Sequence, residues 1–90
     1  MERRIGVIGI VIEQREKAAP QVNAILSRYA DCIIGRMGIP YRERGVAVIA
    51  LIVDGTTDEI GALTGKLGVL PGVRVRAAFT GRPPAKEAEG

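Results

Sequence analysis

The stretch DGTTDEIGALTGKLG at residues 54–68 combines glycines, threonines and a lysine, the residue types of a phosphate-binding loop. Such a loop follows the pattern G-x-x-x-x-G-K-[ST], because its backbone amides wrap the phosphates and its last hydroxyl reaches a magnesium ion. Gly61, Gly65 and Lys66 give a spacing one residue short, and Leu67 stands where the hydroxyl should be. The glycines also fall inside a helical period, so the stretch favours a helix over a phosphate site.

Helix capping accounts for the same residues. Thr56 followed by Glu59 has the pattern of a capping box, in which each residue satisfies a backbone amide of the first turn. We expect Gly68 to end the helix in a left-handed conformation. Gly61 and Gly65 each cost about 1 kcal/mol relative to alanine inside a helix. We therefore expect close packing at these two glycines, against the sheet, the first helix or a neighbouring subunit.

Nucleophilic, acid-base and metal chemistry find little support in the remaining residues. Cys32 has no histidine partner, because the chain has no histidine, and a lone thiol is more typical of a small core residue. One cysteine without histidine also leaves no usual zinc or nickel ligand set. The carboxylates fall at expected helix starts, turns and strand ends: Glu13, Glu16, Asp31, Glu43, Asp54, Asp58 and Glu59. We predict no catalytic residue, no metal site and no cofactor.

The arginines around one expected turn are the best polar group in the chain. Arg36, Arg42 and Arg44 flank Tyr41 and could bind an anion at a hairpin. The alternative is a basic turn that only keeps the surface soluble. Both interpretations stay open at this point.

Composition predicts one small globular domain with an aliphatic core. The chain has 90 residues, of which 47% are hydrophobic and only 3% aromatic, and a formal net charge of +3. Its arginines are scattered and stacking aromatics are few, which argues against direct nucleic-acid binding. No apolar run approaches the roughly 20 residues of a membrane span, and the start lacks a small-residue cleavage site. We expect a cytoplasmic protein.

Hydrophobic periodicity predicts the element order βαββαβ. Residues 4–12 form a buried strand, and a helix follows from about Arg15 to Tyr29. Because Pro20 suits only a first turn, the latest expected start of the regular helix is Ala18 or Ala19. Residues 31–40 and 45–53 form a hairpin, 56–67 a helix and 73–80 a last strand. The fold class is α+β, a ferredoxin-like four-stranded antiparallel sheet with two helices on one face. Residues 1–80 form the domain, and 81–90 are expected to be a disordered tail.

The two central strands of this fold are apolar on both faces, although two helices can cover only one. One of two apolar sets would therefore face water. Val7, Val11, Val46, Val48 and Ile52 form one set, and Ile8, Ile10, Ile12, Ile49, Leu51 and Val53 form the other. A soluble monomer rarely exposes a continuous apolar patch of this size. We expect Arg36, Arg74 and Arg76 at the margins of this face and another copy of the chain over it, in a dimer or tetramer.

The segments RIGVIGIVIE, IIGRMGIPYRERGVAVIALIVDGTTDEIGALTGKLG and LPGVRVRAAF resemble the iron-only hydrogenase system regulator family. The resemblance covers residues 3–80 and is most specific in GRMGIPYRERG and DGTTDEIGALTGKLG. That family is ACT-like and similar in fold to the C-terminal domain of nickel-responsive repressors. The resemblance implies a non-enzymatic protein that regulates the iron-only hydrogenase system, including its transcription. We expect it to act through a protein partner.

The resemblance also implies an alternative, a sensor with a small amino-acid-like ligand at a subunit interface. ACT domains often hold such a ligand beside the turn from first strand to first helix, which here contains Glu13, Gln14 and Arg15. The turn lacks the glycine that many ligand-binding members have. Nickel sensing does not carry over without histidines, and neither does operator binding, because the repressors use a separate domain for DNA.

Overall fold

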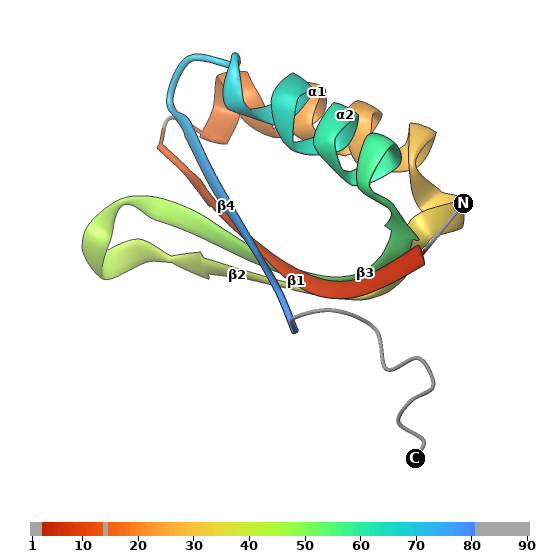
Figure 1. Ribbon diagram of the computed structural model, residues 1–90. Coiled ribbons are helices and arrows are strands. Elements are labelled where there is room, and N and C mark those ends of the chain that lie inside the picture. Colours follow the sequence, from red (N-terminus) through yellow and green to blue (C-terminus); the bar gives the residue numbers. More distant parts are fainter. Residues whose placement is uncertain (1–2, 14, 81–90) are drawn as a thin grey trace.

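The computed structural model describes residues 3–13 and 15–80, and the backbone alone at Arg15 (Figure 1). The expected tail at 81–90 lies outside the described residues. The elements are β1 (Arg3–Ile12), α1 (Arg15–Arg28), the 3-10 turn η1 (Ala30–Cys32), β2 (Ile33–Tyr41), the 3-10 turn η2 (Arg42–Arg44), β3 (Val46–Thr56), α2 (Thr57–Gly68) and β4 (Val73–Phe79).

The four strands form one antiparallel sheet in the order β2-β3-β1-β4, and both helices lie on one face of it (Figure 1). The ferredoxin-like prediction is confirmed, with β1 and β3 at the centre. The expected hairpin also exists, because η2 joins β2 to β3 and ends at Gly45, whose φ of 68° is left-handed. The second left-handed glycine of the described chain, Gly72, has a φ of 77° in the turn before β4.

The core lies between the sheet and the helices. Alternate residues of the central strands point into it, and Ile8, Leu51 and Val53 are fully buried. The two helices contribute apolar side chains at the spacing of one helical face, such as Val22 and Leu26 from α1. No charged side chain of the described residues is buried. The aliphatic layer therefore holds the fold together.

The helix α1 begins at Arg15, earlier than the latest start we predicted, and Pro20 lies inside it. Proline cannot donate its hydrogen bond to the carbonyl four residues back, which costs stability. Pro20 is exposed, so water can reach the carbonyl that is left without a partner. The helix continues past Pro20 because Val22 and Leu26 anchor it to the sheet.

The capping box of α2 is confirmed. The Glu59 amide donates to Thr56 Oγ1 at 3.1 Å, and the Thr56 amide donates to Glu59 Oε1 at 2.9 Å. The expected left-handed stop at Gly68 is wrong, because Gly68 belongs to α2 and Val69 follows with a right-handed φ of −87°. Leu67 is fully buried, which holds the last turn against the core.

Close packing at Gly61 and Gly65 is not found within the chain. A Cβ built on either glycine meets no atom within 4 Å, so neither the sheet nor α1 approaches them. The prediction is wrong for these two surfaces. A contact with another subunit there stays a prediction.

Replacing Thr56 by alanine should lower the free energy of unfolding by about 1 kcal/mol. The substitution removes the Thr56 hydroxyl, so the Glu59 amide in the first turn of α2 loses its hydrogen-bond acceptor. Urea denaturation followed by circular dichroism measures the loss. Thr56→Ser is the control, since serine keeps the acceptor, and an equal loss in both variants would contradict the role of the cap.

Candidate functional site

The turn from β1 to α1 is tied to the turn before β4. The Glu13 amide donates to the Gly72 carbonyl at 2.7 Å, and the Glu13 carboxylate lies 3.1 Å from the Arg74 guanidinium. The carboxylate of Glu13, which we expected to bind a ligand, is therefore already paired with Arg74 of the same chain. Gln14 lies outside the described residues, as does the side chain of Arg15.

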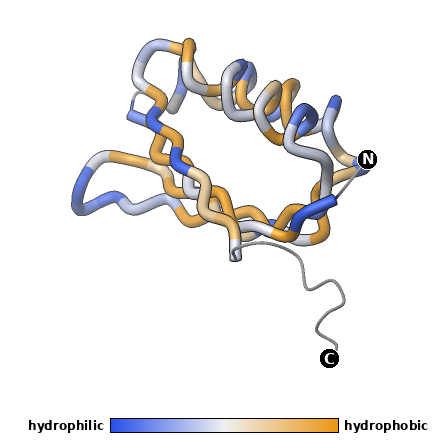
Figure 2. The backbone as a smooth tube through the Cα atoms, viewed as in Figure 1, coloured by the Kyte–Doolittle hydropathy of each residue, from blue (hydrophilic) through white to orange (hydrophobic). Residues whose placement is uncertain are grey.

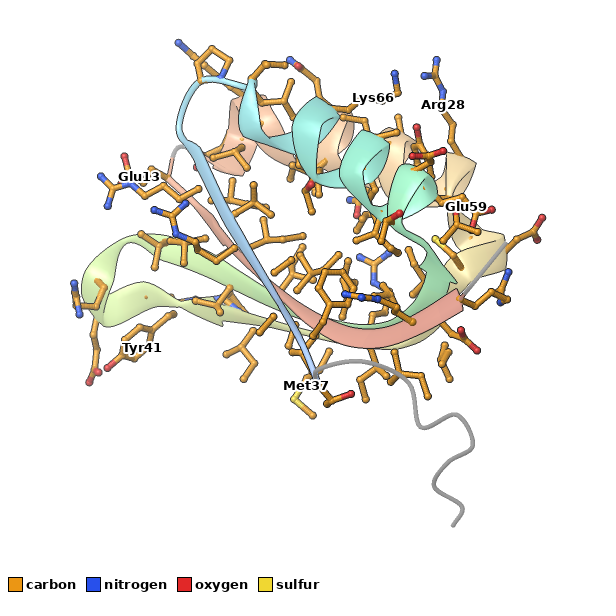
Figure 3. The ribbon with its side chains drawn as sticks, in the orientation of Figure 1. Glu13, Arg28, Met37, Tyr41, Glu59 and Lys66 are labelled. Atoms are coloured by element: carbon orange, nitrogen blue, oxygen red, sulfur yellow. The ribbon has the colours of Figure 1, made fainter. Side chains whose placement is uncertain are left out.

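The arginines predicted around Tyr41 do not form one cluster. Arg36 lies on the helix side of β2, where its guanidinium donates to Asn23 Oδ1 of α1 at 3.1 Å. Tyr41 points away from the helices (Figure 3). Arg42 and Arg44 are exposed in η2, next to Tyr41. Strand alternation explains the separation, because residues five apart point to opposite faces.

A hollow does exist on the helix side of the hairpin. It lies between α1 and the strands β2 and β3, and its lining includes Ala19, Asn23, Arg36 and Pro40. Arg36 is the basic group of this lining. The hollow can therefore offer one guanidinium and one amide to a small acidic molecule.

Cys32 lies in the core, as predicted, although in the turn η1 rather than in a strand. Its thiol is buried and donates to the Tyr29 carbonyl at 3.3 Å. Burial raises the pKa of the Cys32 thiol above its ordinary value, and the negative charge of Glu59 raises this pKa further. The thiol is thus held protonated.

Cys32 should react with iodoacetamide at pH 8 at least about a hundredfold more slowly in the folded protein than in urea, because only the thiolate reacts. The unfolded chain releases the thiol proton near pH 8.5. Stability from this group is therefore present below that pH and lost as pH rises toward the higher pKa of the folded state. Alkylation followed by mass spectrometry measures the two rates. Urea unfolding of the wild type and of Cys32→Ala across this pH range measures the pH-dependent stability. Equal rates would contradict burial.

The sheet face opposite the helices carries most of the exposed large apolar side chains of the described residues. We call it the open face. Its large apolar members are Ile5, Val7, Ile34, Met37, Ile39, Tyr41 and Ile52, which are 43% to 65% exposed. Figure 3 shows Met37 and Tyr41 pointing away from the helices, and Figure 2 shows the hydrophobic colour along the central strands.

The structure shows which apolar face of the central strands lies away from the helices. It is the face with Val7, Val48 and Ile52. Met37 and Ile39 of the edge strand β2 extend this face and were not predicted there. Their period-two alternation with Gly38 and Pro40 was the available signal.

The margin of the open face is basic along β4. Arg74 pairs with Val11 and Arg76 pairs with Gly9 across the sheet, so both arginines share the outward side of β4. Arg36 was expected at this margin too. That expectation is wrong, because Arg36 points toward α1.

Two general properties follow from the described residues. They contain no group of three or more His, Cys, Asp or Glu side chains that could hold a metal ion. Neither helix in the described part of the chain has the length and apolar content needed to cross a bilayer.

Three comparisons place the chain among known proteins. The TM1266-like family model, described as "Iron-only hydrogenase system regulator, putative", matches residues 4–77. The solved structure of uncharacterized protein TM1266 from Thermotoga maritima is 44% identical, covers 88% of this chain and 99% of its own, and has a TM-score of 0.85. Among curated proteins, no sequence matches significantly.

More distant structures share the fold alone. The ACT domain of GTP pyrophosphokinase from Chlorobium tepidum has a TM-score of 0.72 at 22% identity, over 86% of this chain and 100% of that domain. The C-terminal domain of the MgtC protein from Mycobacterium tuberculosis has a TM-score of 0.67 at 15% identity, over 84% and 86%. The ACT-like resemblance is thereby confirmed.

Proposed function

The chain belongs to the TM1266-like family of iron-only hydrogenase system regulators. From this membership we propose that it is a cytoplasmic, non-enzymatic ACT-like module that forms oligomers. We propose that it regulates the hydrogenase system, including its transcription, through a protein partner. The open face is the observation that carries the proposal. An apolar sheet face of this extent is the surface that oligomers bury.

A second copy of the chain is the proposed cover of the open face. A stable interface buries about 800 Å² per partner, and seven half-exposed large side chains with the small residues between them form a surface of that order. Residues 81–90, RPPAKEAEG after Gly81, have no large apolar side chain and could not supply the cover themselves. A two-fold pair buries two such faces in one contact, and two-fold dimers are the commonest oligomers.

The positions of the reactive groups support a non-enzymatic role. The Cys32 thiol is buried and protonated. The carboxylates of Glu13, Asp54 and Glu59 lie in ion pairs or in the helix cap rather than facing one another in a cleft. These groups stabilise turns and strand ends.

A complementation experiment tests the regulatory proposal. The gene is deleted in a host that makes an iron-only hydrogenase, and hydrogenase transcripts and activity are measured. We expect both to change and to be restored by the wild-type chain but not by the open-face variant Ile52→Asp. Unchanged hydrogenase after deletion would contradict the proposal.

A small-molecule sensor is the second candidate, favoured by the hollow that Asn23 and Arg36 line. An acidic amino acid could pair with the Arg36 guanidinium there. Binding would raise the melting temperature, and the rise would grow with the logarithm of the ligand concentration above the dissociation constant. A thermal-shift screen of amino acids should then give a rise that Arg36→Gln abolishes, and no rise with any of them would remove this candidate.

A further inference from the structure

The open face has a regular pattern of large and small side chains across three strands. Antiparallel pairing aligns outward residues of the open face in rows across the sheet, and three of these rows have a residue on each of β2, β3 and β1. The rows are Gly35–Ile52–Val7, Met37–Ala50–Gly9 and Ile39–Val48–Val11. The first row has a glycine on β2 and a large side chain on β1, Gly35 and Val7. The second row has the reverse, with the large side chain of Met37 on β2 and Gly9 on β1.

We propose that the second copy lies face to face across a two-fold axis that runs along β3, so that Met37 of each copy fills the space above Gly9 of the other, and Val7 fills the space above Gly35. The proposal rests on the oligomer proposed above and specifies its geometry. An axis along β3 exchanges β1 and β2 while it keeps each row opposite itself. Each glycine therefore meets a large side chain, and Ile39 meets Val11.

No close contact within the chain requires the two glycines of the open face, although Gly35 adjoins a β-bulge between Ile33 and Gly35. A Cβ built on Gly9 or Gly35 meets nothing within 4 Å, although glycine inside a strand costs about 0.5–1 kcal/mol relative to alanine. Gly6 and Gly55 differ, because a Cβ there would meet atoms of the chain at 2.7 Å and 2.9 Å. The open space above Gly9 and Gly35 is the shape that a side chain of another copy would fill.

The arginines of β4 argue against an axis nearer to β1 and against one perpendicular to the strands. An axis between β2 and β3 also leaves β4 outside the contact, but it leaves Val7 and Gly9 of β1 uncovered. An axis between β3 and β1 would press Met37 against Arg76 and Ile39 against Arg74 of the other copy, and an axis along β1 would place Arg76 over Ala50. Arg74 pairs with Glu13, but taking a guanidinium out of water still costs several kcal/mol of desolvation. An axis perpendicular to the strands would bring the arginines of both copies together. The axis along β3 leaves β4 outside the contact, where Arg74 and Arg76 form a hydrated rim.

The test is an exchange of side-chain size between the two opposed positions. Gly9→Met would place two methionine side chains in one space and should weaken self-association at least about a hundredfold. Met37→Ala should weaken it about tenfold or more by leaving a void. The double variant Gly9→Met with Met37→Ala should recover to within about tenfold of wild type, since each large side chain again meets a small one.

The matched control is Ala78→Leu, which adds an apolar side chain to the same sheet face on β4, outside the proposed contact. Its dissociation constant should stay within about threefold of wild type. Sedimentation velocity over a concentration series measures all four variants, and circular dichroism verifies that each is folded.

The outcomes separate this inference from the proposed function. Wild type that sediments as a monomer would overturn the oligomer and the axis together. A wild-type oligomer that is indifferent to Gly9→Met, or a double variant no tighter than Gly9→Met alone, would overturn only the axis. A large effect of Ala78→Leu would place β4 inside the contact and would overturn it as well.

Discussion

Replacing Ile52 by aspartate should turn the oligomer into a folded monomer. Ile52 lies on the central strand β3 in the middle of the open face and is 49% exposed. An aspartate there would be buried without a partner when the copies associate, at a cost of about 3–5 kcal/mol, which weakens association by roughly a thousandfold. In the monomer the carboxylate faces water, so the core beneath it is unchanged. Sedimentation velocity measures the change in mass, and circular dichroism reports the fold.

Val69→Asp is the matched control for this substitution. Val69 is 79% exposed at the end of α2, away from the open face. The same change of side chain there should leave self-association unaltered. An Ile52→Asp protein with the wild-type mass would show that the open face does not mediate assembly.

Replacing Gly6 by alanine should give the largest loss of stability among the glycine substitutions. A Cβ on Gly6 would lie 2.8 Å from the Ala78 carbonyl oxygen and 2.7 Å from a ring carbon of Phe79. The carbonyl belongs to the paired strand β4 and cannot move without breaking that pairing. We expect a loss of about 2–3 kcal/mol and a fall in melting temperature of about 10–20 °C.

Gly38→Ala is the control for Gly6→Ala. Gly38 also lies in a strand, but its Cβ would meet Ile49 at 3.7 Å, an ordinary contact. Its stability should change by less than about 1 kcal/mol. Denaturant unfolding of both variants at one protein concentration gives the comparison, and equal changes would contradict the close approach at Gly6.

The fold could be predicted from the sequence because its elements are marked locally. Alternating and continuous apolar runs identify the strands, and Thr56 with Glu59 identifies the start of α2. Element ends were less predictable. Pro20 signals a boundary by its own geometry, yet burial of Val22 and Leu26 keeps α1 continuous past it. The same holds for Gly68, which buried Leu67 keeps inside α2.

The candidate site was predictable only in part. The second apolar face follows from the composition of the central strands. Strand alternation, had it been applied to β2 as well as to the central strands, would also have placed part of β2 on that face. It would likewise have separated Arg36 from Tyr41. The opposition of Gly9 and Met37 depends on the register of three strands, which no local pattern encodes.

We expect a second copy of the chain to cover the open face. A native mass spectrum of the untagged wild-type protein tests it most directly, because it reports the subunit count and any retained small molecule together. We expect an even multiple of the 9.6 kDa chain, with no added mass. A single species at the mass of one chain, at concentrations where the protein is folded, would contradict it.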